Sequence, residues 1–270
     1  HQSYMKDINI QFKDQKITTI IGPNGSGKST LLMLLSRIYK IQQGSIELDN
    51  KNIWDYKIKE FARKVAVVHQ KNQVYGDLNV RTIIGYGRLP YLNYHQSLSK
   101  EDEQIIDWAI EVTNLKEHQN KMLNSLSGGQ QRRVAIAGVI AMHPQFLIMD
   151  EPSAGLDPIG RERIFSQVKK WHEKNKFSVI LVTHNMEDIA RLANRLLVMK
   201  QGKIVLDGHP IDLFLNHRKE LLHCGVDVPP LTDTLLYLKD RGIPVPEKAT
   251  EIKDAINKMA GMLKGESYVD

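Results

Sequence analysis

The sequence predicts an α/β domain, built on a mostly parallel β-sheet with helices on both faces. Short, continuous apolar runs recur along the chain, and segments with helical spacing separate them. Strands that are buried on both faces have this uniform apolar composition, whereas a sheet with one exposed face alternates polar and apolar residues. A glycine-rich loop also lies between the first apolar run and a leucine-rich helix, which is the strand, loop and helix order of many α/β folds.

The expected strands of the parallel sheet are rich in Val, Ile and Leu. They are Lys16–Ile21, Lys64–Gln70, Phe146–Glu151 and Ser178–His184. The run RLLVMKQGKIVLDG predicts two more strands that join at Gln201–Gly202. Because so short a joint connects antiparallel strands, we expect an antiparallel β edge beside the parallel core.

Helical segments are expected after the glycine loop, over Lys28–Ser36, and in an insertion between two of the strands. No strand run of comparable quality occurs between the second and third expected strands. There, a Ser99 cap precedes apolar residues at helical spacing. We therefore expect a helical subdomain at about residues 73–145, inserted into a core domain of residues 1–225.

The segment 226–270 is expected to form a separate helical extension. One helix is predicted to begin at a Thr232 cap and to stop at Gly242. A second helix has an apolar stripe at helical spacing. Its members are Ile252, Ala255, Ile256, Met259 and Leu263.

The composition of the chain argues against several classes of protein. Its 270 residues include one cysteine, Cys224, so no disulfide or cysteine-based metal site forms within the chain, and we expect a reducing compartment. No run approaches the ~20 apolar residues of a membrane span, and we expect no secretory leader from the polar opening. The net charge of +6 is a mild excess without a basic block, so we expect no nucleic-acid partner.

The motif GPNGSGKS is a glycine loop in the strand-to-helix context that phosphate binding requires. Gly25 and Gly27 let the backbone wrap a phosphate without interference from a side chain. Lys28 can reach the β- and γ-phosphates of a nucleotide, and the Ser29 hydroxyl can bind Mg²⁺. The flanking strand and helix make a chance glycine loop the weaker explanation. The expected cofactor-binding residues are Gly22, Pro23, Asn24, Gly25, Ser26, Gly27, Lys28, Ser29 and Thr30.

Polar residues end the other expected strands. Asp150 and Glu151 follow an apolar run, where the burial of two carboxylates is costly unless they have a function. Asp150 could hold Mg²⁺, and Glu151 could act as general base toward an attacking water. Gln70 could bind Mg²⁺ or orient that water, and His184 could contact a γ-phosphate. Each residue alone is weak evidence, because strand ends and loops commonly have polar residues.

A second phosphate-binding pattern opens the basic helix predicted for LSGGQQRR. Ser127, Gly128 and Gly129 precede Gln130 at a helix start, where free N–H groups and the helix dipole favour an anion. The string alone has moderate specificity, and its order in the chain is the stronger signal. That order is glycine loop, strand-end Gln, LSGGQ, Asp-Glu strand, SAGLD and strand-end His. In α/β folds such strand-end residues meet at the carboxyl edge of the sheet.

With these motifs in this order, the chain resembles the nucleotide-binding subunits of ATP-binding cassette (ABC) transporters, from about Asp7 to Phe214. The resemblance implies a P-loop NTPase fold with a RecA-like core, and ATP hydrolysis with ATP and Mg²⁺ as cofactors. It implies catalytic roles for three strand-end residues: Glu151, His184 and Gln70. It also implies ATP contacts for the signature, Ser127–Gln130, and for Asp157 of the D-loop.

The resemblance explains why one chain has two phosphate-binding patterns. In ABC ATPases the glycine loop holds the chain's own ATP, while the Ser127 hydroxyl and the Gly129 N–H would contact an ATP held by a partner. The family arrangement thus implies a second ATPase subunit, either a copy of this chain or a paralogue, and a transmembrane permease. The location it implies is peripheral, on the cytoplasmic face of the cell membrane.

The finer resemblance differs between the two halves of the chain. From Lys6 to about Ala137 the chain is similar to ATPases of iron-siderophore and vitamin B12 importers, as in VRTIIGYGRLPYLNY. From about Pro144 it is similar to the ATPases of energy-coupling-factor vitamin transporters, as in VILVTHNMEDIARLANRLLVMKQGKIVLDG. We expect a seam within AGVIAMHPQ, from either a natural lineage or a recombined chain. The implied cargo is an iron-siderophore, a vitamin or a metal.

The start of the chain departs from the family pattern. In the family, an aromatic residue of the first strand stacks on adenine, but Tyr4 stands several residues too close to Lys28 for this role. We therefore expect the first strand to be missing or replaced, and the affinity for nucleotide to be weakened.

The main alternative is a soluble ABC-type ATPase that is not coupled to transport. DNA-repair versions insert a long coiled coil before the signature, and the segment between Lys28 and Ser127 is too short for one. Translation-factor versions have two cassettes in one chain, and this chain has one. A non-hydrolysing, ATP-gated module is the third class, and the presence of Glu151 and His184 argues against it.

Overall fold

The computed structural model describes residues 5, 7–68, 77–93, 96–154, 156–246, 249 and 252–263. The chain forms two compact units. The larger unit comprises residues 13–15 and 29–182, and the smaller unit combines 1–12, 16–28 and 183–270. Both units therefore bring together segments that are far apart in the sequence.

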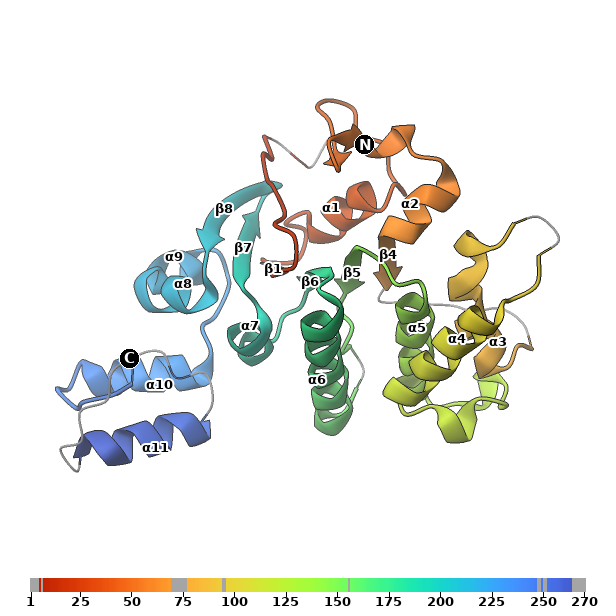
Figure 1. The fold of residues 1–270 in the computed structure, drawn as a ribbon. Coiled ribbons are helices and arrows are strands. Elements are labelled where there is room, and N and C mark those ends of the chain that lie inside the picture. Colours follow the sequence, from red (N-terminus) through yellow and green to blue (C-terminus); the bar gives the residue numbers. More distant parts are fainter. Residues whose placement is uncertain are drawn as a thin grey trace. The chain divides into compact units, whose positions relative to one another are not determined.

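The larger unit is built on three parallel strands, with β5 (Phe146–Asp150) between β4 (Val65–Val68) and β6 (Ser178–Val182) (Figure 1). All of β6 and the middle of β5 are buried. This burial confirms the parallel strands predicted from the continuous apolar runs, because both faces of such strands are covered. Strand β5 ends at Asp150, and Glu151 lies in the turn that follows it.

The helices of the larger unit lie before and between these strands in the sequence. They are α1 (Lys28–Leu35), α2 (Ile58–Lys64), α3 (Val80–Gly85), α4 (Lys100–Val112), α5 (Gly128–Ala141) and α6 (Pro158–Asn175). Shorter 3₁₀ turns are η1 (Ile53–Asp55), η2 (Tyr86–Tyr91), η3 (Lys116–His118) and η4 (Leu123–Ser125). Helices α3, α4 and α5 pack on one another, and the described residues between β4 and β5 include no strand. The limits of the helical subdomain stay a prediction.

The predicted cap of α4 is confirmed. The Ser99 hydroxyl accepts a hydrogen bond from the Asp102 N–H at 3.1 Å, and the Asp102 carboxylate accepts one from the Ser99 N–H at 3.0 Å. This reciprocal capping box satisfies two donors that the helix start leaves free. A short hairpin of β2 (Glu47–Leu48) and β3 (Lys51–Asn52) completes the unit, and its apolar residues pack with η1 and α2.

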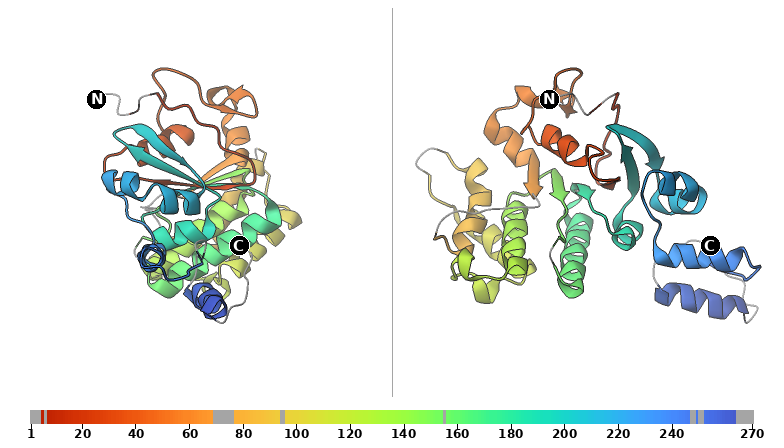
Figure 2. Two further views of the ribbon diagram at one scale, coloured as in Figure 1. Left: turned by 90° about the vertical axis from the view of Figure 1, so that its left-hand side faces the viewer. Right: turned by 180° about the vertical axis from the view of Figure 1, so that it is seen from behind.

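In the smaller unit, β1 (Ile17–Ile21) pairs in parallel with β7 (Arg195–Lys200), and β8 (Lys203–Gly208) pairs antiparallel with β7 (Figure 2). The antiparallel edge predicted from RLLVMKQGKIVLDG is therefore present. Its turn places Gln201 and Gly202 at φ angles of 50° and 77°. Two consecutive residues with positive φ match the twist of a tight hairpin.

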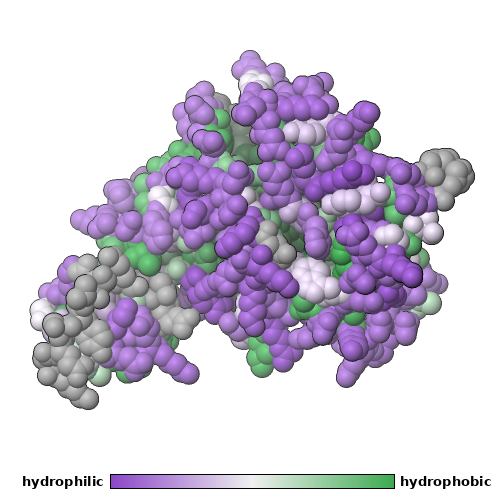
Figure 3. Space-filling model, in the orientation of Figure 1, coloured by the Kyte–Doolittle hydropathy of each residue, from purple (hydrophilic) through white to green (hydrophobic). Residues whose placement is uncertain are grey.

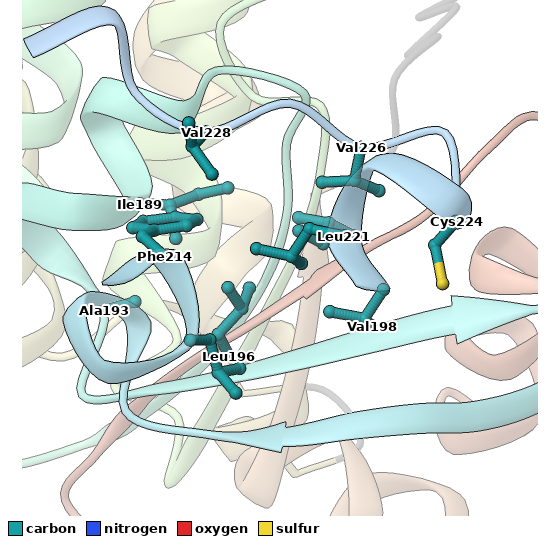
Figure 4. Close-up of a cluster of buried hydrophobic side chains, with 11 residues drawn as sticks. Ile189, Ala193, Leu196, Val198, Phe214, Leu221, Cys224, Val226 and Val228 are labelled. Carbon is teal, nitrogen blue, oxygen red and sulfur yellow. The ribbon is translucent and has the colours of Figure 1, made fainter. Parts of the chain in front are cut away.

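One helix of the smaller unit precedes β7, and the others follow β8. They are α7 (Met186–Leu192), α8 (Pro210–Asn216), α9 (Arg218–His223), α10 (Pro230–Lys239) and α11 (Ile252–Leu263). Figure 4 shows Leu221 and Val226 facing Leu196 and Val198 of β7 in one buried apolar cluster. Cys224 is a buried free thiol of this cluster.

The predicted start of α10 is wrong. The helix begins at Pro230, where the missing N–H of proline costs nothing, and Thr232 is buried inside the first turn instead of capping it. The predicted stop is consistent with Gly242, which has a φ of 78° and donates its N–H to the Lys239 carbonyl at 2.8 Å. The prediction looked for a side chain with a hydroxyl group to cap the helix, whereas the fixed φ angle of proline starts this helix without such a cap.

The apolar stripe of α11 is divided between core and solvent. Ala255 is buried with Leu235 of α10, and Met259 packs against them. Ile252 and Ile256 are 64% and 59% exposed. Among the described residues, no helix is both long and apolar enough to cross a membrane. The face drawn in Figure 3 shows mainly hydrophilic residues, with apolar ones in scattered patches.

Candidate functional site

The glycine loop follows the buried strand β1 and leads into α1. Gly22, Gly25 and Gly27 have φ angles of 147°, 78° and 103°, which side chains disfavour. A Cβ at Gly22 would lie 2.1 Å from the carbonyl oxygen of Met199 on β7. A Cβ at Gly25 would meet nothing within 4 Å, so its φ alone favours glycine there. The loop is therefore pressed against β7 on one side and open at Gly25.

Lys28 folds back across this loop. Its Nζ donates to the carbonyl oxygens of Gly22 at 2.7 Å and of Pro23 at 3.0 Å, and the residue is 7% exposed. The Ser26 N–H donates to the Pro23 carbonyl at 3.1 Å, while the buried Ser26 Oγ has no hydrogen-bond partner within the described part of the chain. A buried amine beside an unsatisfied hydroxyl and a wrapped backbone fits a phosphate group.

His184 and the start of the glycine loop line the same pocket, which has a volume of about 960 Å³ within the smaller unit. Pro23 and Asn24 are among its other lining residues. The turn that presents His184 is fixed by Asn185, whose side-chain oxygen accepts the Asp188 N–H at 2.9 Å and so caps α7. His184 thus shares a pocket with the glycine loop, and its contact with a γ-phosphate stays a prediction.

The signature residues form the start of α5 in the larger unit. Ser127 is the N-cap, and its Oγ accepts the Gln130 N–H at 3.4 Å while Gln130 Oε1 accepts the Ser127 N–H at 2.9 Å. Ser127 and Gly128 are exposed, and a Cβ at Gly129 would lie 3.1 Å from Leu156 of the D-loop. The start of this 14-residue helix thus presents its serine and first glycine to solvent.

The predicted carboxylates lie at the end of β5, also in the larger unit. Asp150 is the last residue of the strand, and Glu151 follows it with a φ of 47°. A positive φ in a residue other than glycine is uncommon and turns the chain out of the strand direction. The Glu151 N–H donates to the Val182 carbonyl of β6 at 3.0 Å, which holds this turn. Ser29 is exposed in the first turn of α1.

These oxygen groups match the chemistry of a magnesium site. Mg²⁺ prefers hard oxygen ligands, and the hydroxyl of Ser29 and the carboxylate of Asp150 are of this kind. Both residues belong to the larger unit. The donor types therefore fit the ion that the sequence predicts.

Arg132 is a residue whose role the sequence analysis missed. Its Nε donates to the Pro152 carbonyl at 3.0 Å, and Nη2 donates to the carbonyls of Asp150, at 3.2 Å, and Glu151. Burial lowers the pKa of this guanidinium, and the charges of Asp150 and Glu151 oppose the shift. The arginine ties α5 to the turn after β5. The sequence hint for this role is that Arg132 lies about one helical turn after Gly128, and so on the same face of the helix.

Other predicted residues are placed differently or not described. The Asp157 carboxylate accepts the Gly160 N–H at 2.5 Å and so caps its own helix, α6. Its predicted contact with ATP stays a prediction. Gln70 and Tyr4, with the predictions made for them, lie outside the described residues.

Comparison with known proteins places these motifs in one family. The family described as "ABC transporter" matches residues 5–154. The chain is 38% identical to the energy-coupling factor transporter ATP-binding protein EcfA2 of Caldanaerobacter subterraneus subsp. tengcongensis, over 98% of this chain and 92% of that protein. It is 39% identical to the petrobactin import ATP-binding protein FpuC of Bacillus anthracis, over 76% of each chain.

Solved structures show the same architecture. The structure of cbiO1 from Clostridium perfringens, part of the ABC transporter complex cbiONQ, superposes with a TM-score of 0.69 at 32% identity, covering 82% of this chain and 89% of that one. A dimeric ATP-binding cassette in a post-hydrolysis state, bound to ADP and Pi, superposes with a TM-score of 0.67 at 29% identity, covering 77% and 90%. The predicted α/β fold, a parallel core with antiparallel strands, is thus confirmed.

The comparisons give no sign of a composite chain. The similarity to EcfA2 extends over nearly the whole length, and so runs across the seam expected near residues 137–145. The glycine loop, signature and Asp-Glu turn described above belong to one continuous pattern. The chain belongs to the ABC transporter family and is an ATP-binding, ATP-hydrolysing ATPase of that family.

Proposed function

We propose that the chain is the motor subunit of a membrane importer, in which two ATPase subunits close head to tail over two ATP molecules. The observation that supports this best is the exposed start of α5. Ser127 and Gly128 face solvent at the N-terminus of a long helix, which is an anion-binding arrangement. A second ATPase subunit, a copy or a paralogue, would bring its own bound ATP to this surface.

In this proposal the chain's own ATP is held by Gly22–Thr30. The open backbone at Gly25 and the Lys28 amine would bind the phosphates, because the amine exchanges its two carbonyl partners for phosphate oxygens. Ser29, Asp150 and Gln70 would hold Mg²⁺, which neutralises phosphate charge when bound.

The catalytic roles fall to residues at strand ends. Glu151 would take a proton from the attacking water, and the bonds that hold its backbone to Val182 and Arg132 keep it in place. His184 would contact the γ-phosphate from the wall of the pocket that it shares with the glycine loop. Asp157 would act through the D-loop, beside the signature.

The trans contacts would come from the signature. The Ser127 hydroxyl and the Gly129 N–H would bind the partner's γ-phosphate, and Gln130 would hold the serine through the capping box. Hydrolysis would remove the ligand that joins the subunits, so the dimer would open. A permease would use this two-state motion.

Sedimentation of the Glu151→Gln variant tests the dimer. With ATP and Mg²⁺ it should move as a dimer, because the ATP that joins the subunits is not hydrolysed. Adding Ser127→Arg should return it to monomer mass while ATP binding persists. The proposal would be contradicted if the Glu151→Gln variant stays at monomer mass in saturating ATP, both alone and when mixed with a paralogue.

The cargo class follows from the relatives. An energy-coupling factor subunit and a petrobactin import subunit are the kinds of protein that the chain resembles. We therefore propose uptake of a vitamin, a metal or an iron-siderophore, with the chain peripheral on the cytoplasmic face of the membrane. The non-transport alternative has no support among these relatives.

Co-purification from membranes discriminates between the two importer types. The chain is expressed with a siderophore-type permease in one strain and with an energy-coupling transmembrane subunit in another. Capture by the first alone supports iron or cobalamin uptake. Capture by the second alone supports vitamin uptake with a paralogous partner, and capture by neither contradicts coupling to these importers.

A further inference from the structure

The 3₁₀ segment η2 (Tyr86–Tyr91) contacts the C-terminal end of the signature helix α5. The contact begins at Gly87, where a Cβ would lie 2.2 Å from the Gly138 carbonyl oxygen and 3.1 Å from the Ala141 Cβ. No side chain fits between the two backbones at this point. Segment η2 and helix α5 therefore touch directly, and a change in one displaces the other.

Arg88 adds a buried polar contact to the same helix end. Its Nη1 donates to the Ala141 carbonyl at 2.7 Å and its Nε to Asp102 Oδ1 at 2.8 Å. The side chains of Arg88 and Asp102 are 8% and 10% exposed. Burial disfavours the charged form of Asp102, but the hydrogen bonds from Arg88 and Ser99 outweigh it and hold its pKa below the ordinary value. The ion pair thus fixes the guanidinium at the helix end.

Tyr91 contacts Met142, the residue that follows Ala141 at the end of α5. Its hydroxyl donates to the Met142 carbonyl at 2.8 Å, and the Arg88 guanidinium stacks 3.9 Å from the centre of its ring. Carbonyls in the last turn of a helix have no partner within the helix. Arg88 and Tyr91 therefore satisfy groups whose positions define where α5 ends.

The segment is also held from its other side. Arg63 of α2 donates to the Pro90 carbonyl at 3.0 Å, and Lys59 donates to the Leu92 carbonyl at 2.6 Å. Segment η2 is therefore fixed between α2 and α5, all within the larger unit. Its contacts with α5 are buried at Gly87 and Arg88 and half-buried at Tyr91.

The position of the helix end affects the helix start. At 1.5 Å per residue, α5 is about 20 Å long, so a tilt of about 3° at its end would move Ser127 by about 1 Å. Displacements of that size in a positioning element can reduce activity by about a hundredfold. The start is held as well, since Gln131 donates to the Leu123 and Leu126 carbonyls and Arg132 donates to the Pro152 carbonyl, so contacts at both ends set the angle of the helix.

We propose that Arg88 and Tyr91 are positioning residues for the trans ATP site: they set the angle of α5 at which Ser127 meets the ATP of the partner subunit. This inference rests on the proposed head-to-tail dimer. It differs from a purely structural role, because it requires dimer closure to weaken in variants whose folded fraction and own ATP binding are unchanged.

The test compares two hydroxyl deletions in the full-length Glu151→Gln background. Tyr91→Phe removes the hydrogen bond to Met142. Tyr56→Phe removes a hydrogen bond of similar length, from a buried tyrosine to the Leu48 carbonyl at 2.7 Å, away from α5. Sedimentation with ATP and Mg²⁺ gives the dimer dissociation constant, a fluorescent ATP analogue gives the monomer affinity, and urea unfolding gives stability.

A third variant, Arg88→Lys, tests the arginine. It keeps the positive charge beside Asp102 and loses the planar guanidinium group.

Tyr91→Phe should raise the dimer dissociation constant by about two- to tenfold, the factor that one net hydrogen bond represents. Arg88→Lys should raise it by at least as much, with nucleotide affinity unchanged in both. Tyr56→Phe should leave the dimer constant unchanged despite a similar loss of stability. Equal dimer constants for Tyr91→Phe and Tyr56→Phe would overturn the inference. A dimer that Ser127→Arg does not disrupt would instead overturn the proposed function.

Discussion

The two phosphate-binding patterns of the chain differ in how far their surroundings complete them. The glycine loop has a buried lysine, two carbonyls that hold its amine, and His184 on the same pocket. The signature has an exposed serine whose hydroxyl, among the described residues, accepts a hydrogen bond from the N–H of its own helix. Both patterns are glycine-rich helix starts, yet only the first lies among groups suited to enclose a phosphate.

This difference shows that a phosphate-binding helix start is not by itself a complete site. Backbone N–H groups and the helix dipole are present in both patterns. The Lys28 amine and a pocket that His184 also lines are present at the glycine loop. An exposed and incomplete start such as Ser127–Gly129 becomes a site when a second subunit supplies the remaining groups, which is the arrangement proposed above.

The largest expected effect is on the hydrolysis of the ATP that the glycine loop would hold. Glu151→Gln should lower kcat by about 10²- to 10⁴-fold, because the amide cannot accept the proton of the attacking water. The affinity for ATP should change little, since the substitution keeps the size of the side chain. Steady-state phosphate release and equilibrium nucleotide binding measure the two quantities. If the kcat of Glu151→Gln lies within tenfold of the parent value, Glu151 is not the general base.

The next effect concerns the anchoring of the signature helix. Asp102→Asn should destabilise the fold by about 3–5 kcal/mol at pH 7, because it leaves the buried Arg88 charge unpaired. Asp49→Asn is the matched control, since its pair with Lys64 is 45% and 34% exposed and should contribute at most about 1 kcal/mol. Urea unfolding of both variants against the parent measures the difference.

The same pair predicts a pH dependence. The pKa of Asp102 is lowered in the folded state, so its stabilisation is fully present above the unfolded pKa of about 3.9 and is lost as pH falls through the folded pKa. The stability gap between parent and Asp102→Asn should therefore narrow below about pH 4. A gap that stays constant from pH 7 to pH 3 would show that charge is not its cause.

A smaller effect, on the affinity for ATP, distinguishes the glycine loop from the signature. Lys28→Ala should weaken ATP binding by about a hundredfold, through loss of charge-assisted bonds to phosphate. Ser127→Arg should leave ATP binding to the isolated chain unchanged, because the signature serves the partner's nucleotide. Binding of a fluorescent ATP analogue at concentrations too low for dimerisation measures both. If Ser127→Arg weakens binding as strongly as Lys28→Ala, the two patterns serve one nucleotide in one chain.

The smallest effect is the loss of a helix cap. Ser127→Ala should lower the free energy of unfolding by about 1 kcal/mol, since its hydroxyl accepts the Gln130 N–H. The affinity of the monomer for ATP should not change. Thermal or urea unfolding of this variant checks the value. No measurable loss of stability would show that the exposed cap is not formed in solution.

The sequence predicted the elements that have a local signature. The apolar runs located β1, β4, β5, β6, β7 and β8, and the capping pattern at Ser99 located the start of α4. The predicted ends of β5 and β6 lie one and two residues beyond the observed ends, because polar residues in the following turn continue the pattern. Thr232 was misjudged because Pro230 begins its helix without a side-chain cap.

The contacts that position the site could not be predicted in the same way. Arg132 reaches the turn after β5, and Arg88 reaches the last carbonyl of α5, 53 residues away in sequence. Such pairs depend on how separate elements pack, and the sequence around each arginine does not identify the carbonyl that it reaches. The sequence therefore gave the identity of the chemical groups, while the structure gave the supports that hold them.

Mixing two inactive variants tests the central claim most directly. In a head-to-tail dimer, Lys28→Ala supplies an intact signature and Ser127→Arg supplies an intact glycine loop, so their mixed pair contains one complete site. At concentrations where the parent chain hydrolyses ATP, an equal mixture should recover up to about a quarter of its activity, because about half of the pairs are mixed and each has one intact site. A mixture no more active than the two variants measured separately would contradict the claim that the two patterns meet on one ATP across two subunits.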